Sequence, residues 1–196
     1  MRVVLGTHVG IIARVTRVEF VFAIGWAAFW LYWLVAAFST KRGRVLWGRE
    51  VRIRVIIVAV AVVAARFGAF HGHLTHAGAL RSAVGLALFA TGLLFAVWAR
   101  VHLGRNWGTP MTQKKEPELV TTGPYRLVRH PIYSGILLAG VGTSVALGWQ
   151  ILVLFGLSAI YFIYAARVEE KFLAERFPDT YPAYKRSSRM LVPYVF

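Results

Sequence analysis

Five apolar stretches without a charged residue recur along the chain, and polar or charged segments separate most of them. They run from Phe20 to Phe38, Val55 to Ala65, Ala83 to Ala99, Ile132 to Gly148 and Gln150 to Ala166. Because a helix rises about 1.5 Å per residue, about 20 residues cross a hydrocarbon core of about 30 Å. The first and third stretches reach that length once their flanks are added. The pattern predicts an all-α, polytopic integral membrane protein with about five transmembrane helices.

The other three stretches are shorter and need further argument. Three arginines bracket the second stretch: Arg52, Arg54 and Arg66. This stretch spans the membrane if their long stems lie along the helix and bring the guanidinium groups to the interfaces. The last two stretches meet at Gly148-Trp149-Gln150, which predicts a helical hairpin. Residues Arg167 to Phe177 then continue as a charged, cytoplasmic C-terminal helix, and Pro178 marks its end.

Composition supports the membrane class. The chain has 196 residues, of which 58% are apolar, too many for an average soluble domain. Short connections predict a single domain over residues 1–196, with three spans in residues 1–100 and the chemistry in residues 101–196. Cysteine is absent, which excludes disulfides, thiolate nucleophiles and cysteine-ligated metals.

The positive charges predict the orientation in the inner (plasma) membrane. Of 23 Lys and Arg, six lie in each of the ranges 41–54, 100–129 and 167–189, and five lie elsewhere. The positive-inside rule then places the amino terminus outside and the carboxyl terminus in the cytoplasm. The net charge of +15 suits either nucleic acid or anionic lipid. Since the charges are scattered among spans, we expect membrane lipids as partners, no nucleic acid and no obligate protein partner.

Two adjacent carboxylates, Glu169 and Glu170, stand where the fifth stretch reaches the cytoplasmic interface. Neighbouring side chains on a helix point about 100° apart. We therefore expect at most one of them to face an interior pocket, while the other faces water or Arg167. The alternative is an ion-pair cluster at the interface.

A second polar concentration precedes the fourth stretch. Gly123-Pro124 predicts a tight turn, and Pro131 suits the first position of a helix. That helix would begin beside Arg129 and His130, and a helix amino terminus with a guanidinium and an imidazole can bind an anionic group. The alternative is ordinary anchoring at the membrane surface.

Three histidines, His71, His73 and His76, lie in the short outer loop. No carboxylate or cysteine stands near them, so we predict no metal site and leave their role open.

Taken in order, three segments resemble the carboxyl-terminal half of the isoprenylcysteine carboxyl methyltransferase family, to which the phospholipid N-methyltransferases are related. The segments are Leu119-Val120-Thr121-Thr122-Gly123-Pro124-Tyr125, Arg129-His130-Pro131-Ile132-Tyr133-Ser134-Gly135 and Glu169-Glu170. The resemblance covers residues 100 to 190, and the ordered triple is more specific than any one segment.

The resemblance implies a methyltransferase that binds S-adenosylmethionine in a cytoplasmic pocket between the long loop, the hairpin and the terminal helix. A lipid-like or isoprenoid acceptor would arrive through the bilayer. By motif position, the implied cofactor contacts are Gln113, Leu119, Val120, Tyr125, His130, Pro131, Ile132, Tyr133, Glu169 and Glu170. Gln113 is placed by a gapped alignment. Positioning would carry most of the catalysis, so no catalytic residue is assigned.

One position departs from the family pattern. The prenylcysteine enzymes are expected to hold the substrate carboxylate with an arginine one helical turn before the first glutamate, where this chain has Ala165. Arg167 is the nearest substitute, but it lies about 160° away around the helix. The acceptor is therefore either of the prenylcysteine type or another hydrophobic molecule, and O-, N- and S-methylation all stay open.

Two other functions compete with methyl transfer. Sterol reductases use a similar Arg-His-Pro-x-Tyr segment to bind NADPH, but they tend to carry an acidic residue where this chain has Ile136. A non-catalytic membrane protein, such as a small transporter, usually places ionisable residues within its spans, which this chain does not.

Overall fold

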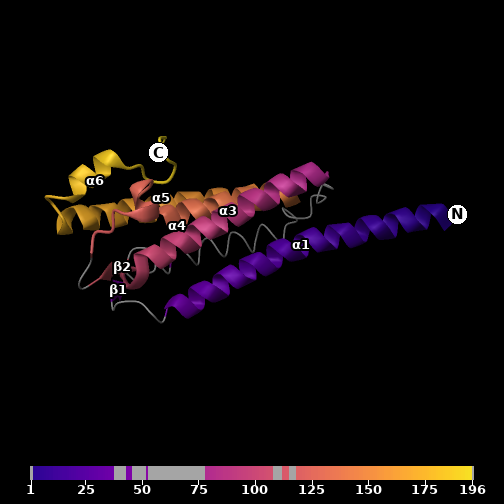
Figure 1. The fold of residues 1–196 in the computed structure, drawn as a ribbon, viewed down its shortest axis with the longest axis horizontal. Coiled ribbons are helices and arrows are strands. Elements are labelled where there is room, and N and C mark those ends of the chain that lie inside the picture. The colour runs from indigo at the N-terminus through magenta and orange to yellow at the C-terminus, as the bar shows by residue number, and fades with distance from the viewer. Residues whose placement is uncertain are drawn as a thin grey trace.

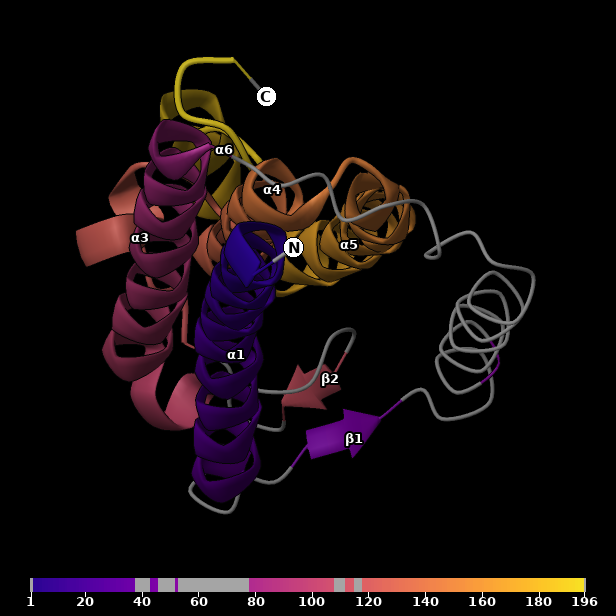
Figure 2. The ribbon, with the colours of Figure 1, turned by 90° about the vertical axis from the view of Figure 1, so that its right-hand side faces the viewer.

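The computed structural model of the chain describes residues 2–37, 43–45, 52, 78–107, 112–114 and 118–195. Its helices are α1 (Arg2–Ala37), α3 (Ala79–Leu103), α4 (Pro131–Leu147), α5 (Gln150–Arg176) and α6 (Tyr181–Ser187). Two 3-10 turns, η1 (Gly104–Asn106) and η2 (Gly123–Arg126), and two strands, β1 (Gly43–Val45) and β2 (Thr112–Lys114), complete the described part. Figures 1 and 2 show α3, α4 and α5 gathered side by side, with α1 along one flank.

The helical membrane class predicted from the apolar stretches is confirmed. Three helical segments, Val18–Ala36, Ala79–Asn106 and Gln150–Arg176, are long and apolar enough to cross a bilayer. Helix α4 is apolar but has only 17 residues. The predicted second span, from Val55 to Ala65, lies outside the described residues. The count of five spans and the membrane hairpin therefore stay predictions.

Helices α3 and α4 pack backbone against backbone and run antiparallel. Gly85 lies against the backbone of Gly142, and Gly92 lies against the backbone of Gly135 and Ala139. A Cβ atom on any of these glycines would collide with the facing helix. Small residues let membrane helices approach this closely, which gives dispersion contacts that larger side chains would block. This contact fixes the start of α4 beside the end of α3.

Aromatic side chains join α1 to the other helices. The rings of Phe22 and Phe89 lie 4.7 Å apart, and the rings of Trp26 and Phe155 stack at 5.6 Å. The Trp26 indole also donates a hydrogen bond to the Thr143 hydroxyl, 3.2 Å away. One residue of α1 thus contacts both α4 and α5, so the apolar core reaches across the bundle.

A buried arginine ties the carboxyl ends of α1 and α3 together. Arg100 is only 3% exposed. Its guanidinium donates hydrogen bonds to the carbonyls of Ala36, at 2.7 Å, and Gly104, at 2.8 Å, and lies 4.6 Å above the Trp107 ring. Since the last carbonyls of a helix lack partners within it, a cation is well placed there.

The short strands correct the all-α prediction in one detail. Strand β1 pairs antiparallel with β2, and Arg44 lies opposite Gln113 in the register. Three residues per strand are too few to leave an alternating pattern in the sequence. The pairing brings the segment after α1 to the loop between α3 and α4 (Figure 2).

Candidate functional site

The site forms where α4 begins and α5 leaves the apolar bundle. Pro131 opens α4, where a proline has no hydrogen bond to lose, and His130 is the residue before it. Helix α5 returns along α4, because Phe155 packs on Gly140 while the acidic pair reaches His130. Two segments that are about 40 residues apart in the chain thus meet at one imidazole ring.

Both carboxylates of the acidic pair face this ring. The Nδ1 atom of His130 lies 3.4 Å from Glu169 Oε2, and its Nε2 atom lies 3.5 Å from Glu170 Oε1. The expectation that at most one of them faces inward is therefore wrong. The ring presents one nitrogen to each carboxylate, so side chains that diverge around α5 can still contact the same residue.

His130 is buried but favours its charged form. Burial alone would lower its pKa, yet the adjacent carboxylates of Glu169 and Glu170 outweigh burial and raise the pKa above its usual value. Its Nε2 atom is buried and makes no hydrogen bond within the described part of the chain. A buried donor without a hydrogen bond is costly, so this nitrogen is a candidate for binding a ligand.

Tyr133 holds Glu169 in place. Its hydroxyl donates a 2.7 Å hydrogen bond to Glu169 Oε1. Its ring is stacked between His130, at 5.5 Å and 3°, and Phe162, at 4.6 Å and 10°. Tyr133 was predicted as a site residue from its motif, but Phe162 was not, because an aromatic residue within an apolar stretch carries no signal of its own.

Glu170 is the buried partner of two cations. It is 4% exposed, and its oxygens lie 2.6 Å from Arg129 Nε and 2.8 Å from Lys185 Nζ. Arg129 Nη1 also donates hydrogen bonds to the carbonyls of Ser188, at 2.6 Å, and Lys185, at 3.3 Å. Arg129 was expected to bind an anionic ligand group, but this geometry directs it to Glu170 and to carbonyls at the end of α6.

Residues 184–191, which we call the C-terminal segment, form one wall of the site. The backbone amides of Arg129 and His130 donate to the carbonyls of Arg189, at 2.7 Å, and Met190, at 3.1 Å. The Ser134 hydroxyl donates to the Leu191 carbonyl, 2.6 Å away. Neither this segment nor Lys185 was predicted to belong to the site, since no local pattern in the sequence indicates long-range backbone pairing.

The turn η2 forms a further wall, on which Tyr125 is buried. Its hydroxyl donates a 3.4 Å hydrogen bond to the Ala99 carbonyl, and its own carbonyl accepts one of 2.7 Å from the Tyr184 hydroxyl. Burial, reinforced by the charge of Glu169, raises the pKa of Tyr125 far above its usual range. Tyr125 therefore stays a neutral phenol that joins α3 to the C-terminal segment.

Gly123 and His102 explain the shape of this turn. Gly123 has φ +58°, a left-handed conformation that favours glycine, and a Cβ atom there would collide with the His102 ring. The His102 ring lies near the Tyr125 ring at 6.4 Å, and its Nε2 atom is 2.8 Å from the Thr122 hydroxyl. His102 therefore positions the turn, a role that its sequence position did not indicate.

The remaining predicted residues lie at different depths. Pro131 and Ile132 are buried in the core beneath His130. Leu119 and Val120 are half-buried in the segment leading to η2, and Val120 packs on the core. Gln113 lies in β2, but its side chain is outside the described part. Arg167, the predicted substrate contact, is exposed, and Ala165 is fully buried.

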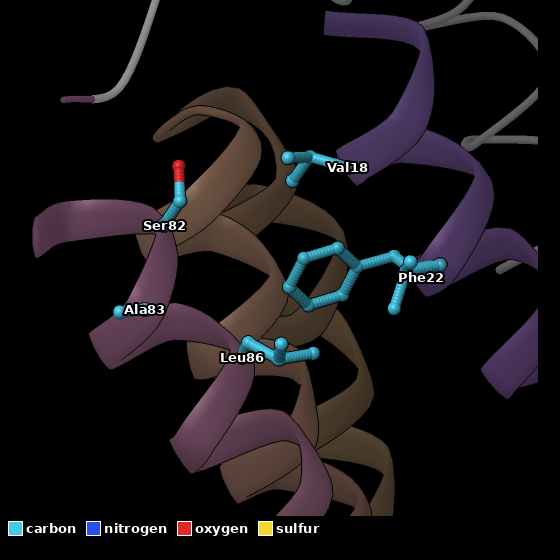
Figure 3. A pocket seen from close by; sticks show the side chains of 6 residues that line it. Val18, Phe22, Ser82, Ala83 and Leu86 are labelled. Carbon is cyan, nitrogen blue, oxygen red and sulfur yellow. The ribbon is translucent and has the colours of Figure 1, made fainter. Parts of the chain in front are cut away.

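An apolar pocket of about 140 Å³ lies elsewhere, between α1 and the first turns of α3. Figure 3 shows Phe22 pointing across it toward Leu86, with Ser82 at its edge. Ser82 lies about 25 Å along α3 from Ala99, at about 1.5 Å per residue. This pocket is therefore separate from the polar site.

Comparisons with known proteins match the part of the chain that carries His130, Tyr133 and Glu169. Residues 80–180 match the family described as phospholipid methyltransferase. Protein-S-isoprenylcysteine O-methyltransferase B of Arabidopsis thaliana is 31% identical over 115 residues, which are 57% of this chain and 58% of that protein. The Saccharomyces cerevisiae protein-S-isoprenylcysteine O-methyltransferase is 32% identical over 126 residues, or 59% of this chain and 50% of that protein.

A relative with a different printed activity is similar to the same extent. Methanethiol S-methyltransferase of a Pseudomonas strain is 32% identical over 111 residues, which are 56% of this chain and 42% of that protein. The chain thus spans about half the length of the curated relatives that it matches. The C-terminal segment lies beyond the residues that the family model covers.

Proposed function

Because the chain belongs to the phospholipid methyltransferase family, we propose that it is an integral membrane methyltransferase that uses S-adenosylmethionine to methylate a lipid-like or other hydrophobic acceptor. The observation that carries this proposal is the convergence of His130, Tyr133 and Glu169 at the start of α4. Relatives named for O-methylation of isoprenylcysteine and for S-methylation of methanethiol support the reaction class and leave the acceptor atom open.

The residues present suit the methyl donor. S-adenosylmethionine, when bound, supplies an activated methyl group on a sulfonium, together with an ammonium, a carboxylate and a ribose. The buried His130 Nε2 has no hydrogen bond in the described part of the chain, so it can donate one to an anionic or hydroxyl group. Glu169 is 26% exposed and can accept from an ammonium or a ribose hydroxyl.

The chain's own residues then act mainly by binding and orientation. Tyr133 fixes the Glu169 carboxylate, while the ring stack with Phe162 keeps the imidazole plane fixed. The apolar core beneath, including Ile132 and Ala165, excludes water from the reacting groups. In-line displacement on an activated carbon depends on the alignment of the reacting groups and the exclusion of water more than on acid or base catalysis.

We also place this site at the cytoplasmic face of the inner membrane. The support is the positive-inside rule, since the basic residues around Arg129 and Lys185 belong to two of the three clusters that carry most Lys and Arg. A soluble donor would then reach the site from the cytoplasm, while an apolar acceptor would reach it from the bilayer.

Ligand binding by the detergent-purified protein tests the proposed function. We expect saturable calorimetric binding of S-adenosylhomocysteine, weakened at least tenfold or so in His130→Ala and Glu169→Gln, since each loses a charge-assisted hydrogen bond. Glu175→Gln is the matched control, because Glu175 is an exposed acid on the same helix and should bind as the unchanged protein does.

The same titration, carried out with NADPH, tests the competing reductase function. NADPH should neither bind nor compete. Saturable NADPH binding together with no affinity for S-adenosylhomocysteine would replace this proposal with a membrane reductase of the sterol reductase type.

A further inference from the structure

We propose that Arg129 is a positioning residue, which holds the C-terminal segment (residues 184–191) against the site through Glu170 and does not itself contact the donor. This inference rests on the proposed function, because it assigns roles within the same site. It divides the acidic pair, with Glu170 as a structural anchor and Glu169 with His130 as the groups that meet the ligand.

The first support is the number of internal partners that Arg129 has. Its Nε donates to Glu170 at 2.6 Å, and its Nη1 donates to the Ser188 carbonyl at 2.6 Å and to the Lys185 carbonyl at 3.3 Å. A planar guanidinium can serve three acceptors in fixed directions, whereas a lysine ammonium is a point charge. The side chain is only 8% exposed, so water does not replace these partners.

The second support is the burial of Glu170. Its carboxylate is 4% exposed and lies between Arg129 and Lys185, with His130 Nε2 3.5 Å away. A buried charge must be paired, and removal of one partner from such a pair is more costly than the pair is stabilising. Glu170 therefore depends on Arg129 for its place, and Lys185, on the C-terminal segment, depends on Glu170.

The third support is the backbone connection to His130. The amide of Arg129 donates to Arg189 and the amide of His130 donates to Met190, next to a parallel bridge between Val128 and Arg189. Arg129 thus holds the C-terminal segment both through its side chain and through its backbone amide. Displacement of that stretch would also release the backbone that orients the imidazole.

Other hydrogen bonds also hold the C-terminal segment, so a change at Arg129 should loosen it only in part. The Tyr184 hydroxyl donates to the Tyr125 carbonyl at 2.7 Å, and the Ser134 hydroxyl donates to the Leu191 carbonyl at 2.6 Å. These two bonds flank the contacts of Arg129. We therefore expect a change at Arg129 to loosen the middle of the segment while the protein stays folded.

Two measurements on the 196-residue chain in detergent test this role: hydrogen exchange by mass spectrometry, and calorimetric binding of S-adenosylhomocysteine. In Arg129→Lys we expect faster exchange in peptides covering residues 185–190 and at His130, with affinity weakened about tenfold, the cost of one charge-assisted hydrogen bond. Arg126→Lys is the matched control, because Arg126 is exposed on the neighbouring turn and should change neither readout.

A second variant separates positioning from direct contact. Lys185→Met removes only the half-exposed cation and leaves the carbonyl that Arg129 binds, so we expect exchange to rise in the same peptides, with a smaller loss of affinity than in Arg129→Lys. Weakened affinity in Arg129→Lys without any change in exchange would mean that Arg129 contacts the ligand, and would overturn the inference.

Failure of the inference is distinguishable from failure of the proposed function. If the unchanged protein binds no S-adenosylhomocysteine, the function is refuted, while the exchange data on ligand-free protein still decide whether Arg129 holds the segment. If the unchanged protein binds and Arg129→Lys matches it in both measurements, the inference alone is refuted.

Discussion

At the scale of single residues, His130 takes part in most of the contacts that form the site. It lies between two carboxylates, stacks on Tyr133, and carries a backbone bond to the C-terminal segment. Its buried Nε2 has no hydrogen bond in the described part of the chain, although the ring favours its charged form. Such a group stabilises the fold through its charge and can still contribute a bond to a ligand.

The first prediction concerns pH. The pKa of His130 is raised in the folded protein from an ordinary value of 6.5, so the folded state binds more protons than the unfolded state as pH passes through this interval. The stabilisation that the charged His130 ring gains from the adjacent carboxylates is therefore complete below pH 6.5 and is lost as pH rises through the raised pKa of His130. We expect the ligand-free protein in detergent to show a thermal unfolding temperature that falls over this range.

The matched variant is His130→Gln, which keeps hydrogen-bonding capacity but does not titrate. Its unfolding temperature should follow a flatter pH profile, so that the difference from the unchanged protein is greatest at low pH. A parallel profile for the two proteins would show that His130 is not the titrating group.

The sequence motifs identified several residues that the structure brings together and missed others, while the role of these residues in binding a cofactor stays a prediction. His130, Tyr133, Glu169 and Glu170 were identified from their motifs, and the structure brings them together. The contacts of Lys185 were not predictable, because they depend on how the chain turns back after α5. A motif identifies residues by their local spacing, whereas backbone pairing across 60 residues depends on the whole path of the chain.

At the scale of elements, the contact between α3 and α4 sets the position of the site. Four glycines along this contact let the two backbones touch, at Gly85, Gly92, Gly135 and Gly142. The sequence alone does not show which helices pair at these glycines. The spacing of seven residues within each helix becomes meaningful only once the antiparallel partner is known.

The second prediction tests this contact. In Gly92→Ala the added Cβ meets backbone atoms of Gly135 and Ala139, which cannot rotate away. We expect a loss of about 1 to 3 kcal/mol in the free energy of unfolding, as for overpacked cores.

Gly156→Ala, on α5, is the control, because nothing lies within 4 Å of its added Cβ. It should be neutral or slightly stabilising, since alanine favours helices more than glycine does. Equal effects in urea or SDS titrations of the two variants would argue against a tight contact.

At the scale of the whole molecule, the distribution of charge predicts the orientation in the membrane. The chain carries 23 Lys and Arg against 8 Asp and Glu, and the site lies between two of its basic clusters. Apolar stretches predicted the membrane class, because the hydrophobic requirement of a span is local. The pairing of β1 with β2 was not predicted, because three-residue strands have no periodicity to detect.

The third prediction is the orientation itself. The chain has no cysteine, so single cysteines can be introduced and labelled with an impermeant maleimide. We expect Arg186→Cys, exposed near the site, to react only after the inner membrane is opened. Gly78→Cys, at the opposite end of α3 with open space around it, should react in intact spheroplasts. The reverse pattern would refute the proposed cytoplasmic site.

The short β1–β2 ribbon has a consequence for how this protein can be recombined with its relatives. Strand β1 belongs to the part of the chain before residue 80, where the family match begins, and it pairs with the loop that leads into the site. A chimera that joins a foreign amino-terminal half to residues 80–196 would therefore interrupt a backbone interface as well as a set of helix contacts. Exchange of the two halves should preserve the loop that leads into the site only when β1 and β2 are transplanted together.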